Sequence, residues 1–156
     1  MDLLGTAIGF VILYLFIRKD IHGITPKKKR AAVKPKETTD GHVYIIANPS
    51  FRNGIFKIGL TTREVSKRLS ELRTTGVPTA FQQCIILKTE DCKALEKKLH
   101  TKWASRRIDS RREFFQLDKG DMAELIDDNR DCIVSMNVDA LGEALGASVE
   151  WFEDLR

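Results

Sequence analysis

The chain has 156 residues, of which 42% are hydrophobic and 31% charged, and its formal net charge at pH 7 is +4. This length allows one compact domain with appendages and excludes two full domains, and the ordinary composition excludes a fibrous or wholly disordered chain. The three cysteines, an odd number without a CxxC pair, indicate neither a disulfide framework nor a zinc site.

Charge is strongly segregated along the chain. Fifteen basic and seven acidic side chains give residues 41–117 a net charge of +8, and three basic and eleven acidic side chains give residues 118–156 a net charge of −8. A basic globular segment predicts an anionic partner. The acidic segment beside it has three interpretations: an internal competitor for that partner, a surface that recruits a protein partner, or a pair of helices that complete the core.

The N-terminal segment, residues 1–19, predicts a membrane anchor. The run Leu3–Ile17 is apolar and ends at Arg18 and Lys19, and at about 1.5 Å per residue such a helix is a little shorter than the hydrocarbon core of about 30 Å. A cleaved signal peptide is the alternative, but Asp2 precedes the run and no small-residue cleavage site follows it. The basic flank places the following chain in the cytoplasm, so we expect a single-pass membrane protein.

Two further features precede the globular part. Gly5 and Gly9 form a GxxxG spacing that lets two membrane helices approach closely, so a homodimer is one interpretation and coincidence is the other. Residues 20–40 carry the basic run Lys27–Arg30 and two prolines without apolar periodicity. This composition is typical of a solvated linker whose charges meet anionic lipid headgroups.

From Gly41 onward the pattern predicts a small α+β domain over residues 41–117, followed by acidic helices over 118–156. Runs rich in β-formers alternate with segments of helical period. The expected strands are 42–47, 55–60 and 80–87. The expected helices run from 61 or 62 to about 73, from 89 or 91 to about 105, over 119–136 and over 138–155. A short apolar segment over 112–117 is expected to return to the core. This order predicts a three-stranded, mostly antiparallel sheet flanked by helices.

Four side chains of this domain are candidates for chemistry on one face of the sheet. Tyr44 and Lys57 fall on neighbouring strands of the hairpin, and Arg68 lies beside the apolar stripe of the first helix. On the second helix, Glu96 shares a face with His100, four residues later. A phenol, an ammonium, a guanidinium and a carboxylate supply a proton acceptor, charge stabilisation and a metal ligand for phosphodiester chemistry. Each residue alone has a simpler explanation, as a strand aromatic, a solvated charge or an exposed helical pair.

Five motifs in this order resemble the GIY-YIG nuclease superfamily. More narrowly, they resemble its Orf-172-type DNA-binding branch, which is named for an open reading frame of bacteriophage T-five. The motifs are Gly41–Tyr44, Phe56–Thr61, Lys67–Leu69, Ala94–His100 and Arg112–Phe115. The resemblance covers residues 41–117 and implies a DNA-binding or nuclease domain.

The resemblance also implies roles for single residues. Tyr44 would activate or position the attacking water, Arg68 would hold the scissile phosphate, and Glu96 would bind one divalent metal ion, Mg²⁺. The expected catalytic set is completed by Lys57. The residues expected to contact DNA are Lys57, Thr61, Arg63, Lys67, Arg68 and His100.

The chain departs from the superfamily pattern at two points. Lys57 stands where the second motif of the superfamily has a tyrosine, and the late asparagine of the superfamily has no evident counterpart. His100 and Glu113 match positions of the branch to which the resemblance gives no role. Three functions therefore stay open: a divalent-metal-dependent endonuclease, a DNA-binding module without catalysis, and a membrane-surface scaffold that recruits a protein partner.

Overall fold

The structure is a computed structural model, and it describes residues 38–73, 77–148 and 151. All of these belong to one compact unit, residues 37–156. The strands are β1 (Gly41–Ala47), β2 (Ile55–Thr61), β3 (Gln82–Thr89), β4 (Phe114–Gln116) and β5 (Ile133–Met136). The helices are α2 (Val65–Glu71), α3 (Cys92–Lys102), α4 (Lys119–Asp128) and α5 (Val138–Leu145), with short 3₁₀ turns η1 (Ala104–Arg106) and η2 (Arg130–Cys132).

The five strands form one antiparallel sheet in the order β4-β2-β1-β3-β5. β1 lies at the centre, and nearly every side chain along it is buried, as expected for a strand covered on both faces. The turn between β1 and β2 closes at Gly54, where φ is +81°. Glycine suits this position because it adopts positive φ without steric strain.

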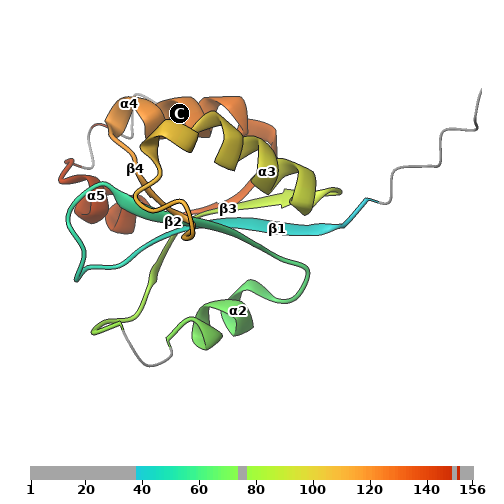
Figure 1. Cartoon of the computed structure of the whole chain (residues 1–156), viewed down its shortest axis with the longest axis horizontal. Coiled ribbons are helices and arrows are strands. Elements are labelled where there is room, and N and C mark those ends of the chain that lie inside the picture. Colours follow the sequence, from blue (N-terminus) through green and yellow to red (C-terminus); the bar gives the residue numbers. More distant parts are fainter. Residues whose placement is uncertain (1–37, 74–76, 149–150, 152–156) are drawn as a thin grey trace, which may run out of the picture. The chain divides into compact units, whose positions relative to one another are not determined.

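The helices divide unequally between the two faces of the sheet (Figure 1). The core face packs against α3, α4 and α5; its strand residues include Val43, Ile45, Phe56 and Ile58. On the opposite face, which we call the α2 face, the buried hydrophobic residues among those that the structure describes are Tyr44, Ile46 and Ile86, and they are covered by α2 and by Leu72 and Phe81. Most of the hydrophobic core therefore lies on one side of the sheet.

The C-terminal helices begin and end at residues suited to these positions. The Asp118 carboxylate accepts a hydrogen bond from the Asp121 N–H (2.9 Å), and Asn137 caps α5 by accepting from the Ala140 N–H (3.1 Å). α5 ends at Gly146, which adopts the left-handed conformation with φ of +60°. Five apolar residues of this acidic segment are buried in the core: Met122, Leu125, Ile126, Ala140 and Leu141. The segment therefore completes the hydrophobic core.

The α+β class and the antiparallel sheet are confirmed, but the expected number of strands is wrong. The sheet has five strands because the short segment Phe114–Gln116 pairs with β2, and Ile133–Met136 pairs with β3. The helix expected over 119–136 ends at Asp128, where the Asn129 side chain donates to the Leu125 carbonyl (2.8 Å) and the chain turns through η2. The helix expected over 138–155 is interrupted at Gly146.

The expectation of a single-pass membrane protein is corrected by the structure. Within residues 38–73 and 77–148, no helix is both long enough and apolar enough to cross a membrane. The anchor predicted over residues 1–19, the Gly5/Gly9 dimer spacing and the basic run of the linker lie outside the described residues.

Candidate functional site

Tyr44 and Gly59 form the centre of the site on the α2 face. They are directly opposed in the antiparallel ladder of β1 and β2. A Cβ atom added to Gly59 would lie 2.5 Å from the Tyr44 hydroxyl oxygen and 2.7 Å from its ring carbon Cζ, so the tyrosine ring lies directly over the glycine backbone. Only 1% of Tyr44 is exposed. The glycine thus provides the space in which the phenol is held.

Arg68 reaches this phenol from α2. The pKa of Arg68 is raised, first by its hydrogen bond with Tyr44 and then by the Glu71 carboxylate, while partial burial opposes the shift. The guanidinium lies 3.3 Å from Glu71, and the side chain of Arg68 is 34% exposed. Arg68 therefore connects the buried hydroxyl to the protein surface.

Two arginines converge on a single carboxylate oxygen beside α2. Oε2 of Glu71 lies 2.9 Å from Arg63 and 3.3 Å from Arg68. Hydrogen bonds from Arg63 and then from Arg68 lower the pKa of Glu71, although partial burial opposes them. Because a phosphate oxygen has the same charge and hydrogen-bonding needs as a carboxylate oxygen, this pair of guanidinium groups can also hold a phosphate.

Lys57 lies two residues before Gly59 on β2, opposite Ile46. Its ammonium group forms an ion pair with the Glu113 carboxylate and lies 5.5 Å from the ring centroid of Phe114. The Lys57 side chain is 11% exposed and the Glu113 side chain 45%. The charge of this lysine is therefore balanced by the carboxylate of the residue that precedes β4.

Glu96 and His100 close the outer edge of β2 beyond the point where β4 ends. The His100 ring donates through Nε2 to the Ile58 carbonyl (3.0 Å), because a carbonyl oxygen can only accept. The backbone N–H of Leu60 donates to the Glu96 carboxylate, and the Ile58 N–H donates to the Glu113 carbonyl (3.2 Å). Side chains of α3 thus take the place of a neighbouring strand.

The environment of Glu96 shifts its pKa upward. Burial is the largest cause and the charge of Glu113 adds to it, while His100, Lys57 and the Leu60 N–H act in the opposite direction. Because burial deprives the charged carboxylate of water, a cation beside it would stabilise its ionised form.

The described residues limit the form that a metal site can take. Among them there is no group of three or more His, Cys, Asp or Glu side chains arranged to hold a metal ion. Mg²⁺ is commonly held by one or two carboxylates, with water and substrate phosphate as its other ligands. A site with Glu96 as its protein ligand is consistent with that chemistry.

The structure brings the four expected catalytic residues around one stretch of β2. The Tyr44 ring lies over Gly59 and its hydroxyl is the hydrogen-bonding partner of Arg68. Lys57 lies on the same strand as Gly59, and its ion-pair partner Glu113 contributes to the pKa of Glu96. The set therefore spans the α2 face and the adjoining edge of the sheet.

The other residues expected to contact DNA are placed differently. Thr61 is buried and its hydroxyl accepts from the Arg63 N–H (3.1 Å), so it shapes the turn before α2. Lys67 is the most exposed of the set and lies 3.4 Å from Glu64. The His100 ring points inward and lies 5.0 Å from the ring of Phe115, measured between centroids.

Glu113 and Phe114 are contacts of the site to which no role was given from the sequence. Both contact Lys57, which is far away in the chain, so only the pairing of β4 with β2 reveals them. The available signal was their position in the last of the five motifs.

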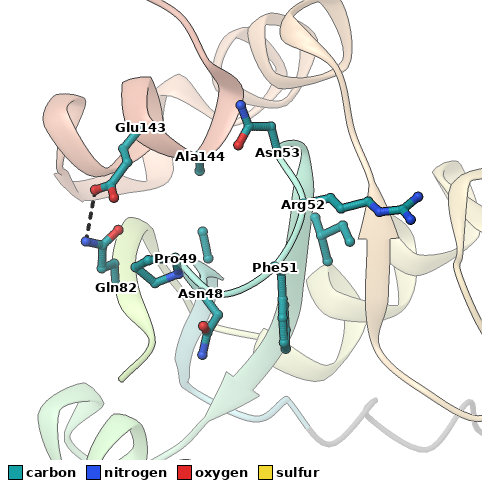
Figure 2. A pocket seen from close by; sticks show the side chains of 10 residues that line it. Asn48, Pro49, Phe51, Arg52, Asn53, Gln82, Glu143 and Ala144 are labelled. Atoms are coloured by element: carbon teal, nitrogen blue, oxygen red, sulfur yellow. Dashed lines mark hydrogen bonds between the residues drawn. The ribbon is translucent and has the colours of Figure 1, made fainter. Parts of the chain in front are cut away.

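A separate hollow lies between the β1–β2 loop and α5 (Figure 2). Gln82 and Glu143, hydrogen-bonded to each other at 3.1 Å, form one wall, and Phe51 and Arg52 of the loop form another. A second hollow lies beside Arg106 and Lys119. Neither is lined by any of the expected site residues, so the candidate site does not lie in these two hollows.

Comparisons with known proteins agree with this arrangement at the level of the family. The T5orf172 domain matches residues 41–130, which extends from β1 through α4 and covers more than half of the chain. No curated protein and no solved structure gives a significant match. The chain belongs to the T5orf172 domain family, whose domain is GIY-YIG-like and nuclease-associated.

Proposed function

We propose that this protein binds DNA at the α2 face and the β2 edge and hydrolyses a phosphodiester bond there. The observation that carries the proposal is the hydrogen bond between Arg68 and the hydroxyl of Tyr44, whose ring lies over Gly59. This contact holds a guanidinium and a phenol side by side, beside an anion position now taken by Glu71. The family supports a DNA-binding or nuclease-like function in general.

Arg68 and Arg63 would receive the phosphate by exchanging Glu71 for a phosphate oxygen. Salt bridges between exposed side chains contribute only about 0–1 kcal/mol, so this exchange is easily made. A phosphate between two guanidinium groups would gain charge-assisted hydrogen bonds. Arg68 would then neutralise the negative charge that develops in the transition state.

Hydrolysis requires a water molecule to attack phosphorus, so that one P–O bond forms and the bond to the leaving sugar oxygen breaks. Tyr44 would position this water or, as a phenolate that has first lost its own proton to solvent, take up the proton that the water loses. The leaving oxygen would take its proton from solvent. A Mg²⁺ ion at Glu96 would supply further charge stabilisation when bound.

The test is nicking of supercoiled plasmid with Mg²⁺ and with chelator. We expect nicking by the wild type to require Mg²⁺ and to fall about 100-fold or more in Glu96→Gln, with DNA affinity little changed. Glu124→Gln is the matched control, because Glu124 is a carboxylate of α4 paired with Lys102 at 2.8 Å. Nicking that survives in Glu96→Gln would remove Glu96 from the mechanism.

A DNA-binding module without catalysis is the second candidate. The near-complete burial of Tyr44 favours it, because water must reach the hydroxyl for catalysis. The pairing of Lys57 with Glu113 points the same way, since it engages a charge that catalysis would use. Tight, salt-sensitive DNA binding without Mg²⁺-dependent nicking would establish this second function.

A further inference from the structure

Residues 106–112, which run from the last residue of η1 toward β4, carry four arginines and one aspartate, a net charge of +3. We call this segment the arginine loop. It follows α3 and leads into Glu113, the ion-pair partner of Lys57. The arginine loop therefore emerges beside the candidate site.

Hydrogen bonds give the arginine loop a defined shape. The Ile108 N–H donates to the Phe114 carbonyl and the Arg112 N–H to the Asp109 carbonyl, both at 3.0 Å. Asp109 also accepts from the Arg111 N–H through its side chain (2.8 Å). The Arg107 guanidinium donates to the Arg112 carbonyl (3.0 Å) and lies 4.8 Å from the ring centroid of Phe115. The loop is thus a hairpin closed across its base and across its tip.

This hairpin presents an apolar side chain among positive charges. Ile108 is 52% exposed, and the Arg111 side chain is 87% exposed. In the part of the chain that the structure describes, Val134 on β5 is the other large hydrophobic residue exposed to this degree. Arg106 is engaged with Asp118 (3.5 Å) and with Asp121 (3.4 Å), and Arg111 lies 3.6 Å from Asp109 within the loop. Ile108 directly follows Arg107 in the sequence of the loop.

We propose that the arginine loop enters a groove of duplex DNA, with its arginines against the phosphates and Ile108 against the base pairs. The proposal rests on the DNA binding proposed above and specifies the substrate as a duplex that bends. Arginine side chains and an inserted apolar residue are a combination that proteins use to widen a groove and partly unstack a base step. The positive charge of the loop complements the two phosphate backbones that border a groove.

The arginine contribution is tested by the salt dependence of binding to a short duplex. Replacing Arg111 and Arg112 together by glutamine should reduce the slope of log affinity against log salt by about 1.8, since each phosphate contact contributes about 0.9. Arg130→Gln is the matched control. Arg130 belongs to η2, which precedes β5 at the opposite end of the strand order from β4, and this variant should keep the wild-type slope.

The insertion of Ile108 between base pairs is tested separately by Ile108→Ser. Val134→Ser, on the opposite edge strand, is its control. Ile108→Ser should lower duplex affinity about tenfold, as expected from withdrawing an aliphatic side chain from apolar contact, and should leave the salt slope unchanged. It should also reduce the bend of the duplex measured by energy transfer between end labels. If Ile108→Ser binds and bends the duplex as the wild type does, Ile108 does not insert between base pairs.

The two proposals fail in different ways. If the wild type does not bind duplex DNA, the proposed function falls and the loop proposal falls with it. If the wild type binds duplex DNA but both loop variants bind and bend it as the wild type does, only the loop proposal falls. Urea denaturation of each variant identifies any loss of folding; exposed positions such as Ile108 and Arg111 tolerate substitution with little change in stability.

Discussion

The two faces of the sheet differ in how they are held. On the core face, three helices bury residues such as Phe56, Leu99 and Leu125 completely. On the α2 face, α2 has seven residues, none of them fully buried, and its N-cap Glu64 makes no side-chain capping hydrogen bond. The candidate chemistry therefore lies mainly on the face that contributes less to the hydrophobic core.

This difference suggests a division of roles within the domain. Hydrophobic stabilisation grows with the apolar area removed from water, so the core face supplies most of it. The α2 face can carry a glycine, an arginine and a hydrogen-bonded phenol because the fold does not depend on dense packing there. Substitutions on the two faces should consequently separate stability from function.

Truncation of a large core-face residue should have the greatest effect on stability. Phe56 is completely buried, and Phe56→Ala should lower the free energy of unfolding by about 3–5 kcal/mol. On the α2 face Leu69 is partly buried, and Leu69→Ala should lower it by only about 1–2 kcal/mol. Urea titrations measure both. Equal losses for the two variants would contradict the division between the faces.

Filling the space above Gly59 should have the next largest effect. In Gly59→Ala the new methyl group would meet the Tyr44 ring at 2.5–2.9 Å, so the ring must move, at a cost of about 1–3 kcal/mol. The contact between Tyr44 and Arg68 should be lost as well. Gly120→Ala is the control, because its nearest neighbour is the Asp118 side chain at 3.3 Å, and it should change the midpoint of unfolding little.

Removal of the Tyr44 hydroxyl should affect function more than stability. Tyr44→Phe keeps the ring over Gly59 and loses only the hydrogen bond with Arg68, which is worth about 0.5–1.5 kcal/mol. If the site is a nuclease, nicking should fall sharply while duplex affinity stays close to that of the wild type. Full nicking activity in Tyr44→Phe would show that the phenol only supports the fold.

The smallest effect should appear in the pH dependence of stability. The pKa of Glu96 is raised in the folded protein, so the folded protein binds the carboxyl proton more tightly than the unfolded chain does. The wild type therefore loses stability as the pH rises above the carboxyl's ordinary pKa of about 4.5. Glu96→Gln lacks this loss and should become the relatively more stable protein at pH 7, with no such advantage at pH 4. Urea midpoints of both proteins at the two pH values measure this difference. A stability advantage of Glu96→Gln that grows toward low pH would show that the pKa of Glu96 is not raised in the folded protein.

Sequence patterns predicted the elements with strong periodicity and missed those too short to have one. The first two strands and the Asp91 cap of α3 follow from β-rich runs, turn signals and a capping residue. β5 was hidden because Ile126 and Ile133 continue the apolar spacing of the helix before it. The helix ends before β5 because the Asn129 side chain donates a hydrogen bond to the Leu125 carbonyl in the last turn of α4.

The site could be predicted as a set of residues but not as a set of contacts. The hairpin register places Gly59 beside Tyr44, and the helical period places Arg68 near them, so this half was accessible from the sequence. The pairing of Lys57 with Glu113 depends on a strand of three residues. The hydrogen bond from a backbone N–H to Glu96 could not be predicted from the sequence, because every residue except proline carries such a donor.

The closed edge of β2 has a consequence for how copies of this chain meet. A strand edge with free N–H and carbonyl groups can accept a strand from another molecule, and such pairing leads to aggregation. At Ile58 both backbone groups are already engaged, by His100 and by Glu113, and Glu96 engages the N–H of Leu60. The sheet therefore cannot grow by strand addition at this position, beside the candidate site.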